Sequence, residues 1–186
     1  MARTDPPRVL MDACAFIAII KDEPDSRRLD PLLDMLDRRD AQLVESVQIL
    51  GEVYKKSAAT HLATRLFEDG KLDSIRARLL SRDVELLDVT LPITRRATEY
   101  RQTYRLKLPD AVHLATAVLN KCDWFVTFDG KFPDIEGMRT FRLEHLQDRS
   151  FSLPWEAPVQ GELFPLTSNV VPMRPPGSSD AEVAGS

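Results

Sequence analysis

The stretch RVLMDACAF, residues 8–16, leads from an apolar segment directly into an aspartate. Residues Arg8–Asp12 predict a central strand that is buried on both faces, with Asp12 at the point where the strand ends. A single carboxylate in a low-dielectric environment needs a counter-charge, a proton or access to water. Further acids follow at comparable places along the chain, which suggests that the counter-charge is a metal ion.

Strand-like and helical segments alternate outward from this stretch, and proline or glycine separates many of them. This alternation predicts βαβ units, an α/β fold with a central parallel sheet of about five strands and helices on both faces. The expected strands are Arg8–Asp12, Gln42–Glu45, Val84–Val89, Trp124–Phe128 and Arg139–Arg142. The expected helices are Cys14–Lys21, Arg27–Arg39, Val47–Lys56, Leu62–Glu68, Leu72–Leu80, Ile93–Arg105 and Asp110–Asn120.

The length of 186 residues suits one well-packed domain, which we place at residues 1–148. Residues 149–186 are rich in proline and predict a flexible C-terminal tail. Four acids and one base follow Phe151, so most of the net charge of −4 belongs to the tail, and a nearly neutral body can still carry a basic face.

Cys14 and Cys122 lie far apart and form neither a redox pair nor a zinc ligand set, which is typical of a reduced, cytoplasmic setting. The apolar segment VLMDACAFIAII is too short to span a bilayer and contains Asp12, so we expect no membrane segment.

Acids occur where an open parallel sheet binds ligands, beyond the carboxyl ends of its strands. Asp12 ends the first expected strand, and Asp129 follows the fourth, two residues after Thr127. Asp110 opens the helix in LPDAVHLATAV, and Glu52 lies beside the apolar stripe of the helix in VQILGEVYKK. Four oxygen donors from separate segments favour a magnesium-type site.

The spacing of these acids leaves a second interpretation open. Asp110 is equally typical of a helix start, and Asp129 of the turn in FDGKF. Asp12 and Glu52 are harder to explain in this way because each interrupts apolar sequence.

Four segments in order, VLMDACAFIAII, ESVQILGEVYKK, LKLPDAVHLATAV and WFVTFDGKF, resemble the PIN-domain nucleases. Within that family the chain is most similar to the VapC-type toxins of type II toxin–antitoxin systems, over residues Val9 to Leu143. The resemblance implies a three-layer α/β/α PIN-like fold. It also implies that the catalytic, metal-binding carboxylates are Asp12, Glu52, Asp110 and Asp129.

The function that this resemblance implies is an endoribonuclease that uses Mg²⁺ or Mn²⁺ and a metal-activated water to cleave RNA. A cognate antitoxin as inhibitor and a homodimeric state are also implied. The Thr127 hydroxyl is expected to orient an acid or a water. The alternative is a non-catalytic PIN-like module that binds RNA or protein.

Three further positions bear on the site. Cys14 stands where the family usually has asparagine, serine or threonine, and its small and apolar neighbours favour a packing role. His113 lies one turn after Asp110, and the sequence gives it no role. The helix ITRRATEYRQTYRLK interleaves arginines with two tyrosines, which fits either stacking on single-stranded RNA or a solvated face with an Arg95–Glu99 pair.

Overall fold

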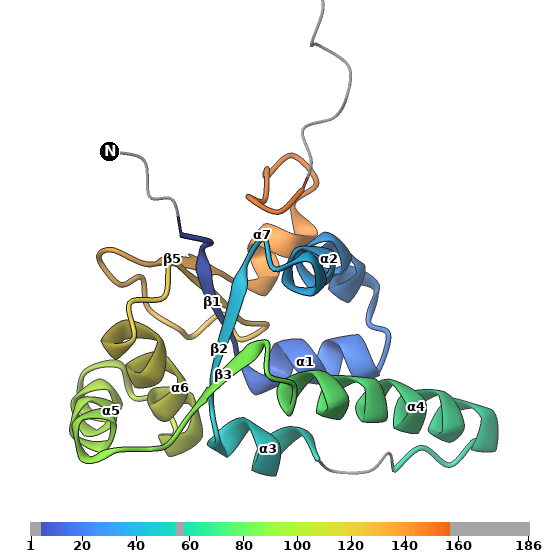
Figure 1. The fold of residues 1–186 in the computed structure, drawn as a ribbon, viewed down its shortest axis with the longest axis horizontal. Coiled ribbons are helices and arrows are strands. Elements are labelled where there is room, and N and C mark those ends of the chain that lie inside the picture. The colour runs from blue at the N-terminus through green and yellow to red at the C-terminus, as the bar shows by residue number, and fades with distance from the viewer. Residues whose placement is uncertain (1–4, 55–57, 157–186) are drawn as a thin grey trace, which may run out of the picture.

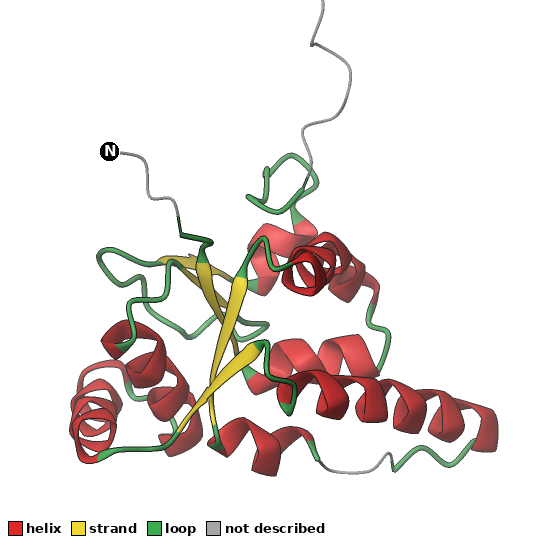
Figure 2. Ribbon diagram, viewed as in Figure 1, coloured by secondary structure: helices red, strands yellow, loops and turns green. Residues whose placement is uncertain are grey.

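The computed structural model describes residues 5–54 and 58–156, and a fully parallel five-stranded sheet lies at its centre (Figures 1 and 2). The strand order is β3-β2-β1-β4-β5, which confirms the predicted fold class. The strands are β1 (Arg8–Met11), β2 (Gln42–Ser46), β3 (Val84–Leu87), β4 (Trp124–Val126) and β5 (Arg139–Phe141). The bounds of each strand differ from the expected bounds by at most two residues.

The order of the strands fixes where a ligand would bind. The chain passes from β1 through β2 to β3 at one edge, and then crosses back to place β4 and β5 on the other side of β1. The connections therefore diverge between β1 and β4, and ligands of open parallel sheets bind beyond the carboxyl ends at such a point. Asp12 directly follows β1, and Thr127 directly follows β4.

Helices cover both faces of the sheet (Figure 1). Val9 and Met11 of β1 face a core built with α1, α2, α4 and α7, whereas Leu10 between them faces a core built with α5 and α6. A strand that buries alternate residues on opposite faces explains why RVLM is apolar throughout. The helices are α1 (Ala13–Ile20), the 3₁₀ helix η1 (Pro24–Leu29), α2 (Asp30–Arg38), α3 (Gln48–Val53), α4 (Leu62–Leu79), α5 (Leu91–Tyr104), α6 (Leu108–Leu119) and α7 (Leu143–Gln147).

Two helical predictions were wrong. The sequence predicts a break at Gly70, but α4 continues through it as one helix of 18 residues. A glycine inside a helix costs only about 1 kcal/mol, and Leu72, Ile75 and Leu79 of the same helix are buried. The short helix α7 was not predicted, because its five residues offer too few turns for a periodic pattern.

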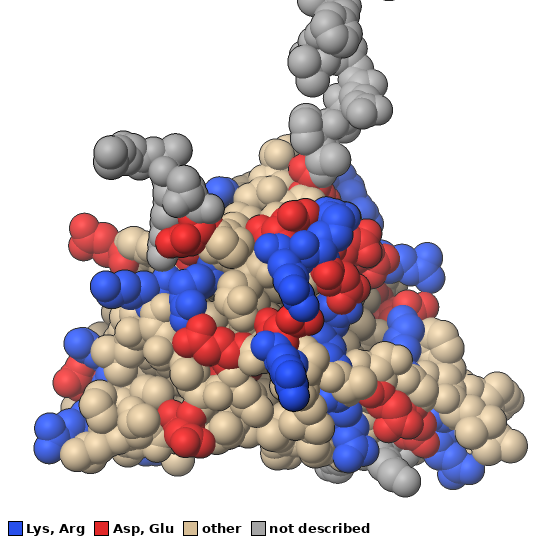
Figure 3. Space-filling model, viewed as in Figure 1, with Lys and Arg blue, Asp and Glu red and all other residues tan. Residues whose placement is uncertain are grey.

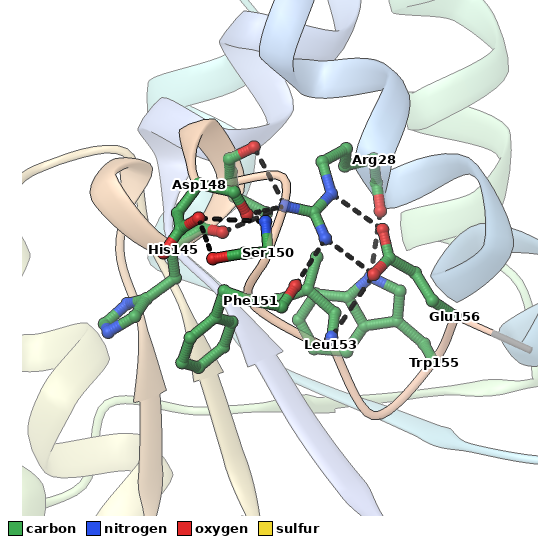
Figure 4. Close-up of polar contacts among 9 residues, drawn as sticks. Arg28, His145, Asp148, Ser150, Phe151, Leu153, Trp155 and Glu156 are labelled. Atoms are coloured by element: carbon green, nitrogen blue, oxygen red, sulfur yellow. Dashed lines mark hydrogen bonds and ion pairs between the residues drawn. The ribbon is translucent and has the colours of Figure 1, made fainter. Parts of the chain in front are cut away.

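Residues beyond α7 are anchored by Arg28 in an arrangement that we call the C-terminal clasp, residues 148–156 with Arg28 (Figure 4). The buried guanidinium binds both carboxylate oxygens of Glu156, at 2.7 and 2.6 Å. It also donates to four backbone carbonyls, those of His145, Leu146, Asp148 and Phe151. Leu153 and Trp155 are buried in the core.

The domain boundary predicted after residue 148 therefore falls before the end of this packed segment. The rest of the predicted tail, residues 157–186, lies outside the described residues. In Figure 1 the clasp lies toward the end of the sheet where β1 and β2 begin, and α3 lies beyond their other ends. No helix in the described part of the chain is long and apolar enough to cross a membrane.

Candidate active site

Asp12 is fixed at the end of β1 from two sides. Its backbone N–H donates to the carbonyl of Val126 in β4 at 2.8 Å, which continues the sheet by one bond. Its Oδ1 accepts from the N–H of Ala13 at 2.7 Å and caps α1. The residue is only 3% exposed, so sheet and helix together hold one carboxylate at the point where the connections diverge.

The second oxygen of Asp12 belongs to a small polar network. Oδ2 accepts from the hydroxyl of Thr127 at 3.1 Å and from the thiol of Cys14 at 2.9 Å. Thr127 Oγ1 accepts in turn from the backbone N–H of Asp129 at 3.0 Å, and Cys14 Sγ accepts from Phe128 N at 3.0 Å. Burial and then the charge of Asp12 raise the pKa of Cys14 to about 12, so the thiol keeps its proton and donates it. The sequence favoured a packing role for Cys14, but the thiol also makes polar contacts with Asp12 and the backbone of Phe128.

Asp110 lies in the first turn of α6, and its carboxylate interacts with the other three predicted acids. Burial raises its pKa, and the charges of Asp12, Asp129 and Glu52 raise it further, against a smaller opposing effect of Lys107. The charges of acids from three other segments thus act on Asp110.

Asp129 carries two roles at once. Its Oδ1 accepts from the N–H of Lys131 at 2.9 Å, which is the turn that the sequence left open as an alternative. Its charge nevertheless acts on Asp110. The turn contact occupies one oxygen, and it orients the carboxylate without neutralising it.

Glu52 is half-buried in α3 and is held by two side chains through a single oxygen. Oε1 lies 2.8 Å from Nε2 of His113 and 3.0 Å from Nε2 of Gln48. Burial raises the pKa of Glu52, but the hydrogen bond and charge interaction with His113, together with Gln48, outweigh burial and leave the pKa below its ordinary value. Glu52 therefore stays ionised beside the other acids.

His113 is a site residue that the sequence did not reveal. It is fully buried on α6, one turn after Asp110, and reaches α3 to contact Glu52. Its signal in the sequence was only its spacing from Asp110, because the contact joins residues 61 positions apart.

Glu45 of β2 was also missed, although it interrupts apolar sequence as Asp12 does. Its side chain is completely buried, and Oε1 accepts from the N–H of Met11 at 2.9 Å. The ladder between β1 and β2 pairs only Arg8 with Gln42 and Val9 with Leu43, so this carboxyl enters where the two strands part. Its Oε2 has no hydrogen-bond partner among the described residues.

The electrostatics of Glu45 follow from this position. Burial raises its pKa well above the ordinary value, the N–H of Met11 opposes this, and the charges of Asp12 and Glu52 add to the rise. Glu45 therefore lies close to the site, in surroundings that favour its protonated form. We call the five acids the acidic cluster: Asp12, Glu45, Glu52, Asp110 and Asp129.

The donors of the acidic cluster are all carboxylate oxygens, the ligand type of hard divalent cations such as Mg²⁺. A bound cation would give the buried Oε2 of Glu45 a partner and would offset the effects that raise the pKa of Asp110. Across residues 5–54 and 58–156, however, no three His, Cys, Asp or Glu side chains are arranged so that they could hold a metal ion. The carboxylate oxygens suit a divalent cation, but the side chains of the described residues do not form a ligand set for one.

Helix α5 is less available to RNA than its sequence suggests. Tyr100 is buried in the core and only Tyr104 is partly exposed, so the two rings do not form a stacking surface. Glu99 pairs with Arg96 at 3.0 Å, not with Arg95 as expected. On the face that Figure 3 shows, Lys and Arg side chains are intermixed with Asp and Glu and form no continuous basic field.

Comparisons with known proteins identify a family and solved structures of similar fold. The sequence model of the PIN domain matches residues 9–138, a range that contains all five members of the acidic cluster. No curated protein matches the chain.

Several solved structures have a similar fold. VapBC2 from Rickettsia felis, bound to a DNA fragment from its promoter, is 18% identical and aligns over 73% of this chain and 98% of that chain, with a TM-score of 0.52. VapBC-5 from Mycobacterium tuberculosis is 20% identical over 74% of this chain and 99% of that chain, with a TM-score of 0.50. A toxin–antitoxin complex from Klebsiella pneumoniae is 23% identical over 71% and 96%, with a TM-score of 0.48. At these identities the likeness is one of fold.

Proposed function

This chain belongs to the PIN domain family, and on that premise we propose that it is a metal-dependent endoribonuclease, the toxin of a toxin–antitoxin pair. Membership of this family supports a nuclease. The observation that carries the proposal is the match of the PIN domain to residues 9–138, together with the burial of Asp12 at the carboxyl end of β1, and the charges of Asp12, Asp129 and Glu52 on Asp110 agree with it. Repulsion within a set of carboxylates at the carboxyl ends of a parallel sheet destabilises the fold, so such a set indicates a functional site.

The residues that would hold the ion are Asp12, Asp110 and Asp129, with Glu52 completing the set or holding a second ion. A bound Mg²⁺ or Mn²⁺ supplies positive charge that polarises a phosphodiester and lowers the pKa of an attacking water. Thr127 and Cys14 keep Asp12 in one orientation through their donated hydrogen bonds. No histidine is required for this chemistry.

The orientation of the acids is set by groups that cannot easily turn. The backbone N–H of Lys131 holds one oxygen of Asp129, and the backbone N–H of Ala13 holds one oxygen of Asp12. The second oxygen of Asp12 accepts from Thr127 and Cys14, so its orientation is fixed at both oxygens. Pre-oriented donors lose little entropy when they meet a cation and a phosphate.

RNA is the proposed substrate. Arg101 and Arg105 of the α5 region, with Thr98, Gln102 and Leu106, line a shallow surface pocket of about 350 Å³. The guanidinium groups of Arg101 and Arg105 are suited to the phosphates of a single strand.

An antitoxin and a second copy of the chain are the proposed protein partners. Support for an antitoxin comes from the solved structures of similar fold, two of which are VapBC proteins of toxin–antitoxin systems. The first half of α4 also exposes Leu62, Leu66 and Phe67, each at least half accessible. Apolar side chains grouped on one exposed helix are a surface that a partner protein would cover.

The substitution Asp110→Asn tests the catalytic proposal. It preserves the shape of the side chain and removes a charge that no cap depends on. We expect loss of Mn²⁺-dependent RNA cleavage and of growth arrest on expression, with an unchanged circular dichroism spectrum. Cleavage at the wild-type rate would instead favour a PIN-like module that binds RNA or protein without cutting it.

A further inference from the structure

The contact between His113 and Glu52 connects two elements of the site that are far apart in sequence. Glu52 belongs to α3, a helix of only six residues. His113 belongs to α6, the helix that also carries Asp110. Because Asp110 and His113 are three residues apart, they lie on the same side of α6, one turn from each other.

The chemistry of the contact is defined by its acceptor. An ionised carboxylate only accepts, so Nε2 of His113 carries the proton and donates it to Oε1 of Glu52, 2.8 Å away. Nδ1 of the same ring is buried and has no partner within the described residues. The ring therefore has one polar contact through which it can act, and that contact is with Glu52.

Gln48 donates to the same oxygen, Oε1, from one turn earlier in α3. Both donors therefore meet one oxygen and leave Oε2 of Glu52 to the acidic cluster. The charge of Glu52 acts on both Asp110 and Glu45, although one of its oxygens is engaged by His113 and Gln48.

We propose that His113 is a positioning residue: by holding Oε1 it fixes the carboxylate of Glu52 in the orientation in which Glu52 would help to hold a divalent cation. This inference rests on the proposed function. One turn of α6 then sets the relative position of two carboxylates, its own Asp110 and the Glu52 of α3. A histidine that only filled the core would have no effect on the cation.

The experiment compares Mn²⁺ binding to full-length variants by isothermal titration calorimetry. In His113→Leu we expect Mn²⁺ affinity to fall by about tenfold or more, the usual effect of removing a group that orients a ligand. His113→Gln places an amide N–H near the position of Nε2 and should restore most of the affinity. Thr116→Val is the matched control, since Thr116 is fully buried on α6 one turn further on and its hydroxyl has no partner among the described residues.

A double-variant cycle shows whether His113 acts through Glu52. In a Glu52→Gln background, His113→Leu should cause no further loss of Mn²⁺ affinity. Full additivity of the two losses would overturn the inference, as would a His113→Leu protein that binds Mn²⁺ as tightly as Thr116→Val.

A second measurement covers a His113→Leu protein that does not fold. Nitrogen-15 NMR of wild-type His113 should show the tautomer protonated at Nε2, and Glu52→Gln should shift that resonance; protonation at Nδ1 alone would overturn the inference. Wild-type protein that neither binds Mn²⁺ nor cleaves RNA would remove the proposed function itself. Wild-type binding that His113→Leu leaves unchanged removes only the role of His113.

Discussion

The C-terminal clasp and the acidic cluster treat buried charge in opposite ways. In the clasp, the guanidinium of Arg28 has both oxygens of Glu156 and four carbonyls as acceptors (Figure 4). The carbonyl of Arg28 itself accepts from the indole of Trp155 at 2.9 Å. In the acidic cluster, the charges of three acids raise the pKa of Asp110 and, among the described residues, Lys107 opposes them.

This difference separates structure from function. A buried charge whose donors are all satisfied and whose counter-charge is in contact stabilises one conformation. Carboxylates that repel one another destabilise the folded state unless a cation binds between them, and Oε2 of Glu45 also has no hydrogen-bond partner among the described residues. The clasp is therefore expected to matter for stability, and the cluster for the binding of a cation.

The largest expected effect comes from breaking the clasp. Arg28→Met leaves Glu156 without its counter-charge and removes a donor from four carbonyls, of which that of Asp148 keeps the N–H of Phe151, so the free energy of unfolding should fall by about 3–5 kcal/mol. Urea unfolding measures this loss. Arg38→Met is the control, because the exposed Arg38–Asp40 pair contributes about 0–1 kcal/mol. Equal losses in the two variants would mean that the clasp is no stronger than a surface ion pair.

The next effect is the response of the cluster to a cation. Mn²⁺ at about 100 times its dissociation constant should raise the free energy of unfolding by about 2.7 kcal/mol, because only the folded chain brings the acids together. Thermal unfolding with MnCl₂, and again after EDTA, measures the gain and its reversal. The Arg28→Met protein should gain as much as the wild type, since the clasp has no part in the cluster. No gain in either protein would contradict the cation site.

A smaller effect of opposite sign is expected when one acid of the cluster is neutralised without a cation. Asp110→Asn removes repulsion from Asp12, Asp129 and Glu52, so with EDTA present it should stabilise the fold by up to about 1 kcal/mol. Urea unfolding in EDTA tests this, with Asp34→Asn, an exposed acid on α2 outside the cluster, as control. In saturating Mn²⁺ the order should reverse. An Asp110→Asn protein that is less stable in EDTA would show that the carboxylate is structural.

The same contrast explains what the sequence could predict. Strand positions followed from local apolar runs, because a strand buried on both faces is apolar along its length. Asp12, Glu52, Asp110 and Asp129 were found because each stands at a strand end, at a helix start or within an apolar segment, and the resemblance to the family supplied their common role.

Contacts between distant segments left no such local signal. Arg28 meets Glu156 across 128 positions, and nothing in its neighbouring residues distinguishes it from a solvated arginine. Glu45 reads as the polar end of a strand, and its burial arises only because β1 and β2 part beside it. Long-range packing decides both cases, so a pattern within one segment cannot reveal them.

The smallest expected effect concerns Glu45 and its dependence on pH. Because the pKa of Glu45 is raised in the folded state by burial, the unfolded chain releases this proton first as the pH rises. Below the pKa of Glu45 in the unfolded chain, the residue is protonated in both the folded and the unfolded state, and it does not change the free energy of unfolding. Above that pKa the free energy of unfolding falls as the pH rises, until the pKa in the folded state is reached. Glu45→Gln cannot ionise, and its amide oxygen can still accept from Met11. Its buried N–H groups offset part of the gain, so the net change should stay small.

The diagnostic is therefore the slope and not the size of the change. The difference in free energy of unfolding, Glu45→Gln minus wild type, should increase as the pH rises from about 4.5, by at most about 1.4 kcal/mol per pH unit. Urea unfolding over a pH series in EDTA measures it, and the contributions of all other acids cancel in the difference. A constant difference across the series would mean that Glu45 ionises alike in both states. In that case the burial of Glu45 would be offset by its contacts, as the burial of Arg28 is in the clasp. Glu45 would then not belong to the acidic cluster.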